Sequence, residues 1–140
     1  MNIEPNLDSI ISFVLISKGV FASVLLFLKK GNRRANFFLS ILTLFMSFWL
    51  LDTFFRVSGI YNQNPNFYFL PIYFSFGFGP LIYLYTKKLT QKRAKFKWNE
   101  LFHFISVLLQ FLFYCYLQFQ DYEFRRNFWV EVHQTFLSEY

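Results

Sequence analysis

Apolar residues are concentrated in four runs of about 20 residues, separated by short polar segments. The runs cover residues 9–28, 36–57, 66–86 and 98–119. A 20-residue helix is about 30 Å long, which matches the hydrocarbon thickness of a bilayer. The pattern predicts an all-α fold: a polytopic membrane helical bundle of four transmembrane helices, forming a single transmembrane domain over residues 1–140.

The segment after the fourth run, residues 127–140, has a different pattern. Apolar side chains recur there at every fourth position, and charged or amide side chains break up the other faces; the apolar positions are Phe128, Val132, Phe136 and Tyr140. This spacing predicts a short amphipathic C-terminal helix that lies on the outer membrane surface. A longer chain cut just before a fifth span would show the same pattern.

Composition and charge support a membrane protein. Hydrophobic residues make up 55% of the chain and charged residues only 16%, against roughly 25% in soluble domains. The net charge is +6, and most basic residues lie in two loops beside apolar runs: Lys29, Lys30, Arg33 and Arg34 in one, and Lys87, Lys88, Lys92, Arg93, Lys95 and Lys97 in the other. The positive-inside rule predicts that both loops are cytoplasmic and both termini external. Specific binding of anionic lipid, or of a partner's acidic face, is the alternative explanation of the clusters.

Three charged residues fall within the predicted spans. Lys18 lies near the middle of the first span, where a lone lysine costs about 2.5–3.5 kcal/mol and needs a partner or a water-filled recess. Asp52 lies in the outer half of the second span, and Arg56 follows it by four residues on the same helix face. Lys18, Asp52 and Arg56 therefore form either an outward-facing polar pocket for a small ligand or a structural network that fixes helix packing.

The third run contains a predicted helix break at Gly77, Gly79 and Pro80. Proline has no amide hydrogen to donate to the preceding turn, and it biases the residue before it away from helical angles. The break would serve as a hinge or expose backbone dipoles to a ligand. Alternatively, the two glycines let a neighbouring helix approach closely.

Residues typical of enzyme chemistry are sparse. Glu100 and His103 lie at the start of the fourth run and are interpreted as interfacial, while His133 belongs to the opposite side of the membrane. Cys115 is the only cysteine, which excludes an internal disulfide. We therefore expect no enzymatic activity, no metal site and no cofactor.

Three short motifs resemble a known family. The sequences Gly79–Tyr85 (GPLIYLY), Leu101–Ile105 (LFHFI) and Lys29–Asn36 (KKGNRRAN) resemble the membrane-embedded N-terminal region of bacterial AraC-type transcriptional regulators. The resemblance implies a multi-pass protein of the bacterial cytoplasmic (inner) membrane. Ser106 departs from the pattern, because the relatives have proline at this point. The family's cytoplasmic helix-turn-helix domain is not present in this sequence, so we expect no direct nucleic-acid binding by the chain itself.

These observations predict a sensory or interaction module that works in the lipid bilayer, either as a homo-oligomer or with another membrane or cytoplasmic protein. The ligand is not defined by the sequence. The alternatives are a small oligomeric transporter, in which Lys18 would favour anionic substrates, and a nonfunctional gene fragment.

Overall fold

The computed structural model describes residues 7–91 and 98–137 and is entirely helical over these ranges, with no strand. The elements are α1 (Leu7–Leu28), α2 (Arg33–Val57), α3 (Ile60–Gln63), α4 (Phe78–Thr90), α5 (Ile105–Gln118) and α6 (Tyr122–Leu137), with 3-10 turns η1 (Pro65–Phe67), η2 (Ser75–Gly77) and η3 (Trp98–Phe104). The predicted all-α fold is confirmed.

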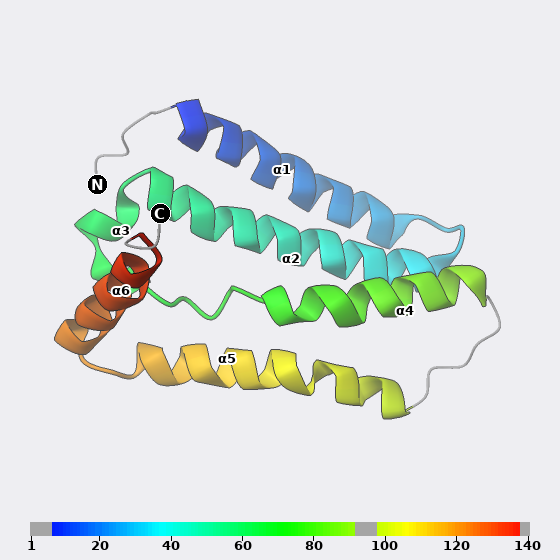
Figure 1. Ribbon diagram of the computed structural model, residues 1–140. Coiled ribbons are helices and arrows are strands. Elements are labelled where there is room, and N and C mark those ends of the chain that lie inside the picture. Colours follow the sequence, from blue (N-terminus) through cyan, green and yellow to red (C-terminus); the bar gives the residue numbers. More distant parts are fainter. Residues whose placement is uncertain (1–6, 92–97, 138–140) are drawn as a thin grey trace.

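The long helices lie side by side in one bundle, as Figure 1 shows for α1, α2, α4 and α5. Within the described ranges, three helices are long and apolar enough to cross a membrane: α1, α2, and the continuous stretch Trp98–Gln118 formed by η3 and α5. The outer face of the bundle is covered with apolar side chains; Phe21, for example, is 65% exposed and Phe102 67% exposed. Such a surface suits lipid as the surrounding solvent, which identifies a membrane protein.

Small side chains allow α1 and α2 to approach closely. An ideal Cβ placed on Gly19 of α1 would lie 2.2 Å from Ser47 Oγ of α2. The Ser23 hydroxyl donates a hydrogen bond of 2.8 Å to the Ser40 carbonyl across the same interface. Lipid tails are as apolar as leucine, so membrane helices associate through close packing and interhelical hydrogen bonds of this kind.

The predicted third helix over residues 66–86 is wrong in its extent. The chain there forms η1, an irregular stretch over residues 68–74, η2, and only then α4. The irregular stretch contains Pro71, and Phe69 adopts a left-handed φ of 55°. Pro80 lies in the first turn of α4, where its missing amide hydrogen has no intrahelical acceptor to lose. The break therefore ends at Gly77, the first of the three predicted residues, and Pro80 lies in the first turn of a helix instead of interrupting one.

The alternative interpretation of the two glycines was that they let a neighbouring helix approach closely. Gly77 does so for α2. An ideal Cβ at this position would lie 2.7 Å from Cε2 of Phe45 on α2. Nothing lies within 4 Å of the corresponding position on Gly79. The first glycine is thus required for packing against α2, whereas the second is not.

The C-terminal amphipathic segment is helical and begins earlier than residue 127. Helix α6 spans Tyr122–Leu137, and residues 138–140 lie outside the described ranges. In Figure 1, α6 and α3 occupy the end of the bundle opposite the Lys29–Lys30 loop. The rings of Trp129 and Tyr61 meet there, with centroids 5.0 Å apart.

Candidate functional site

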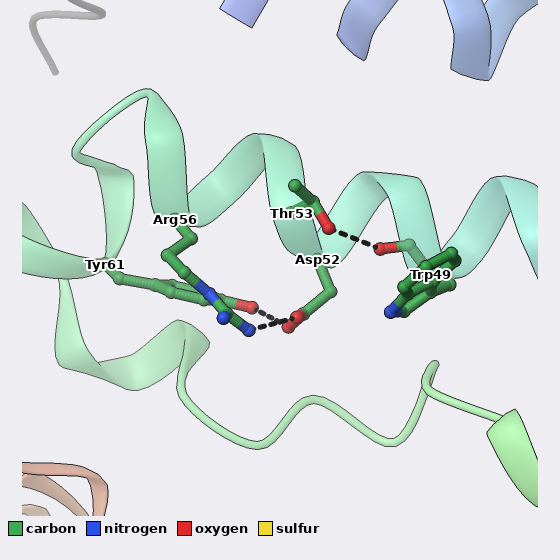
Figure 2. Close-up of polar contacts among 5 residues, drawn as sticks. All are labelled: Trp49, Asp52, Thr53, Arg56 and Tyr61. Carbon is green, nitrogen blue, oxygen red and sulfur yellow. Dashed lines mark hydrogen bonds and ion pairs between the residues drawn. The ribbon is translucent and has the colours of Figure 1, made fainter. Parts of the chain in front are cut away.

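The carboxylate of Asp52 lies near the C-terminal end of α2 and accepts hydrogen bonds from two side chains (Figure 2). Arg56 Nη2 approaches Asp52 Oδ2 to 3.1 Å, so the ion pair expected from the four-residue spacing is present. The Tyr61 hydroxyl donates to Oδ1 of the same carboxylate. Gly59, with a φ of 72°, turns the chain between α2 and α3 and so brings Tyr61 back over Asp52.

Aromatic rings extend this contact to two further segments. Tyr61 is only 2% exposed and packs edge-on against Tyr68 and Trp129, while the latter two rings stack with centroids 4.9 Å apart. The Arg56 guanidinium lies 5.7 Å from the Trp129 ring centroid, a cation–π distance. We call Asp52, Arg56, Tyr61, Tyr68 and Trp129 the Asp52 junction. The junction joins α2, α3, the irregular stretch and α6 through the Asp52 carboxylate and the aromatic rings packed around it.

The electrostatics of the junction favour a neutral tyrosine. Burial raises the pKa of the Tyr61 phenol, and the neighbouring Asp52 carboxylate raises this pKa further. The phenol therefore stays protonated at physiological pH and donates to Asp52.

Lys18 lies elsewhere. Its side chain is exposed on α1, and within the described ranges its ammonium forms no ion pair, so Lys18 does not join Asp52 and Arg56. The residues one and two turns away on the same side of α1 are also exposed: Ile11, Val14, Phe21 and Leu25. The predicted three-residue pocket is thus divided into a junction at one end of the bundle and a lone lysine on the outer face.

The helix break is held by a residue that the sequence interpretation missed. Gln110, on α5, is buried; its Oε1 accepts a hydrogen bond of 3.2 Å from the Phe76 amide, and its Nε2 donates to Ser75 Oγ at 3.1 Å. An amide side chain in the middle of an apolar run was the signal available in the sequence. The Phe76 amide at the break is thereby satisfied inside the protein.

A second missed network ties α6 to the bundle. Arg125 is 9% exposed and donates from Nη1 to Gln118 Oε1 and from Nη2 to Asn66 Oδ1, both at 3.1 Å. Gln118 in turn donates to the Tyr68 carbonyl. The sequence did not indicate this role of Arg125, because Asn66 lies 59 residues away and Gln118 belongs to a different helix.

At the opposite end of the bundle, Glu100 is buried between two lysines. Its Oε1 lies 2.7 Å from Lys87 Nζ and its Oε2 lies 3.6 Å from Lys88 Nζ. His103 is exposed, and its ring contacts Tyr83 with centroids 5.4 Å apart. Of the two residues interpreted as interfacial, Glu100 therefore fastens η3 to α4, while His103 remains at the surface.

Over the described ranges, no group of three or more His, Cys, Asp and Glu side chains is arranged to hold a metal ion. Comparison of the chain with known protein families, curated proteins and solved structures finds no match. The residues themselves therefore carry the functional argument.

Proposed function

We propose that this chain is a sensory and interaction module of the bacterial inner membrane, equivalent to the transmembrane half of an AraC-type regulator and acting through a separate partner protein. The chain would cross the membrane four times with both termini outside. The three membrane-length helices support this topology, as does the position of the α1–α2 loop and the C-terminal end of α4, which carries Lys87 and Lys88, at the same end of the bundle (Figure 1). The resemblance of the sequence motifs supports the regulator class.

The fourth crossing would be made by residues 66–90. Helix α4 has 13 residues and is about 20 Å long, which is shorter than the hydrocarbon layer. The irregular stretch would complete the crossing. Non-helical backbone is tolerated at membrane depth where protein covers it, and the Gln110 hydrogen bonds to Ser75 and Phe76 provide such cover.

The exposure of Lys18 is the observation that carries the proposed interaction. The residue lies at the middle of α1, about 16 Å from either helix end, on a face made of apolar side chains. A charge at this depth is costly unless it is paired. Because the chain's own packing leaves this ammonium on the outside, a partner helix carrying a carboxylate at mid-membrane depth would satisfy it.

The three membrane-length helices of a second copy carry no acidic residue at mid-depth. Asp52 is the acidic residue nearest in depth within α2, about 10 Å from that helix's centre, and it already binds Arg56 and Tyr61. Asp8 lies in the first turn of α1, and Glu100 is buried against lysines at the basic end. The partner is therefore a different membrane protein with an Asp or Glu in a membrane helix.

The Asp52 junction would provide the sensory input. It joins the end of α2 to α6, the helix that would lie on the outer surface, and the Arg125 network joins α6 to α5. A ligand or protein that displaces α6 would thus act on two membrane helices together.

Crosslinking in native membranes tests the interaction. A photoreactive residue replacing Val14, one turn from Lys18, should crosslink to a second protein, which mass spectrometry would identify. Lys18→Leu should abolish the adduct, and Lys18→Arg should retain it because the charge is kept. Phe21→Leu on the same face is the matched control and should leave the adduct unchanged.

An adduct that persists in Lys18→Leu, or that contains only a second copy of this chain, would contradict the proposal. Equal membrane levels of the variants, measured by immunoblot, exclude failed insertion as the cause of a lost adduct. A helix-turn-helix domain in the captured partner would support the regulator class.

A further inference from the structure

A large groove opens at the basic end of the bundle, between α2, α4 and η3. Its volume is about 1260 Å³, and its body is lined by apolar side chains that include Phe37, Phe38, Ile41, Leu81, Leu101 and Phe104. Small-molecule pockets usually enclose about 300–1,000 Å³. The groove is therefore larger and more uniformly apolar than a typical metabolite site.

Basic residues line the same groove. Arg33 and Arg34, at the start of α2, are exposed, and Lys88 comes from the last turns of α4. Asn32 donates a hydrogen bond of 3.3 Å to the Lys88 carbonyl, which ties the α1–α2 loop to α4 beside the groove. The Glu100 carboxylate offsets part of the positive charge near the groove, but Lys87 Nζ already lies 2.7 Å from Glu100 Oε1. The local charge remains positive.

We propose that this groove binds an anionic phospholipid of the leaflet at the basic end. One acyl chain would lie along the aromatic and aliphatic body, and the phosphate would be held by Arg33 and Arg34. Guanidinium groups bind phosphate oxygens through paired hydrogen bonds, and basic pockets beside membrane helices are typical of anionic lipid headgroup sites. A zwitterionic lipid would leave the net positive charge uncompensated.

Lys29 and Lys30 provide a matched control for the two arginines. They belong to the same loop region and carry the same total charge, but they do not line the groove; they line a smaller recess of about 410 Å³ that adjoins it at Phe27 and Arg33. General attraction of the basic end for anionic lipid would depend equally on either pair. A defined phosphate position would depend on Arg33 and Arg34.

The test is lipid binding to the purified full chain in detergent, titrated with phosphatidylglycerol and measured by native mass spectrometry. Arg33→Gln with Arg34→Gln should weaken binding about 10- to 30-fold, the effect of two basic residues at a lipid surface. Lys29→Gln with Lys30→Gln should change it less than about threefold, since these residues lie outside the groove. Leu101→Trp, which fills the apolar body, should also weaken binding while circular dichroism shows unchanged helicity.

Three results would overturn the inference. One is equal loss of binding in the arginine and lysine double variants, which would mean unspecific attraction. Another is equal binding of phosphatidylcholine. The third is displacement of the lipid by inorganic phosphate together with no effect of Leu101→Trp, which would mean a phosphate site without a bound acyl chain.

Discussion

At the scale of single residues, Tyr61 connects the chemistry of the Asp52 junction to its packing. The side chain is buried, its hydroxyl donates to Asp52, and its ring contacts Trp129. Because the fold raises the pKa of this phenol, it stabilises the protonated form. By linkage, that contribution is fully present below the unfolded tyrosine pKa of about 10 and is lost as the pH rises through the higher folded value.

Replacing Tyr61 by phenylalanine should reveal this contribution. We expect Tyr61→Phe to lower the free energy of unfolding by about 1–3 kcal/mol at pH 7, because Asp52 loses a buried donor. The loss of stability of the wild type above about pH 10 should become shallower in the variant. Thermal unfolding in detergent between pH 7 and 11 measures both effects. Tyr116→Phe, at an exposed tyrosine of α5, should match the wild type; an equal effect there would contradict the assignment.

The ion pair of this junction could be predicted from the sequence. Asp52 and Arg56 lie on one helix, so their spacing alone determines that they meet. Whether Lys18 reaches them depends on the rotation of α1 about its axis, which spacing within one helix does not determine. The convergence of Tyr61, Tyr68 and Trp129 depends on the turn at Gly59 and on the return of α6, and both are long-range features.

At the scale of elements, Gly19 and Ser47 form a close contact between α1 and α2. The ideal Cβ of a residue at position 19 would be 2.2 Å from Ser47 Oγ but 3.4 Å from Ser47 Cβ, which is nearly ordinary contact. The Ser47 hydroxyl donates to the Thr43 carbonyl within α2, so rotating it away loses this hydrogen bond. The hydroxyl oxygen is therefore the atom that prevents a larger residue at position 19.

A double-variant cycle tests this contact. Gly19→Ala should destabilise the protein by about 1–3 kcal/mol through overpacking. Ser47→Ala alone should have a small effect, and the combination Gly19→Ala with Ser47→Ala should recover most of the lost stability because the interfering oxygen is gone. Melting temperatures of the four proteins in detergent provide the measurement. Gly79→Ala, with open space around the added methyl, is the control; a double variant no better than Gly19→Ala would refute the contact.

The helix bounds also show which membrane helices the apolar pattern predicts correctly and which it does not. The ends of α1, α2 and α5 lie within three residues of the corresponding run boundaries, apart from the 3-10 turn η3 that begins the last stretch. The third run is also apolar but contains Pro71, the packed Gly77 and Pro80 in the first turn of α4. Hydrophobicity predicts burial in lipid, whereas continuity of the helix depends on these few residues and on the Gln110 hydrogen bonds.

At the scale of the whole molecule, the charge asymmetry and the four-crossing topology make one prediction. If residues 66–90 cross the membrane, Gln91 lies on the same side as Lys30, and Gln63 lies on the other. If they do not cross, Gln91 lies on the side of Gln63. Single cysteines at these three positions distinguish the two topologies, in a background where the half-buried Cys115 is replaced by alanine. Each position is exposed, so a maleimide reagent can reach it from the surrounding water.

We expect a membrane-impermeant maleimide to label Gln63→Cys in intact cells, because the segment around it carries no Lys or Arg from Ser58 to Asn66 and so translocates readily. Lys30→Cys and Gln91→Cys should react only after the membrane is permeabilised, since the positive-inside rule predicts that the two loops, with ten basic residues, are cytoplasmic. Labelling of Gln91→Cys from outside, with Lys30→Cys still protected, would mean that the short helix α4 and its irregular stretch re-enter instead of crossing. In that case Lys88 would lie on the outer side, apart from a cytoplasmic Arg33, and the groove that these two residues line would have to be reconsidered as well.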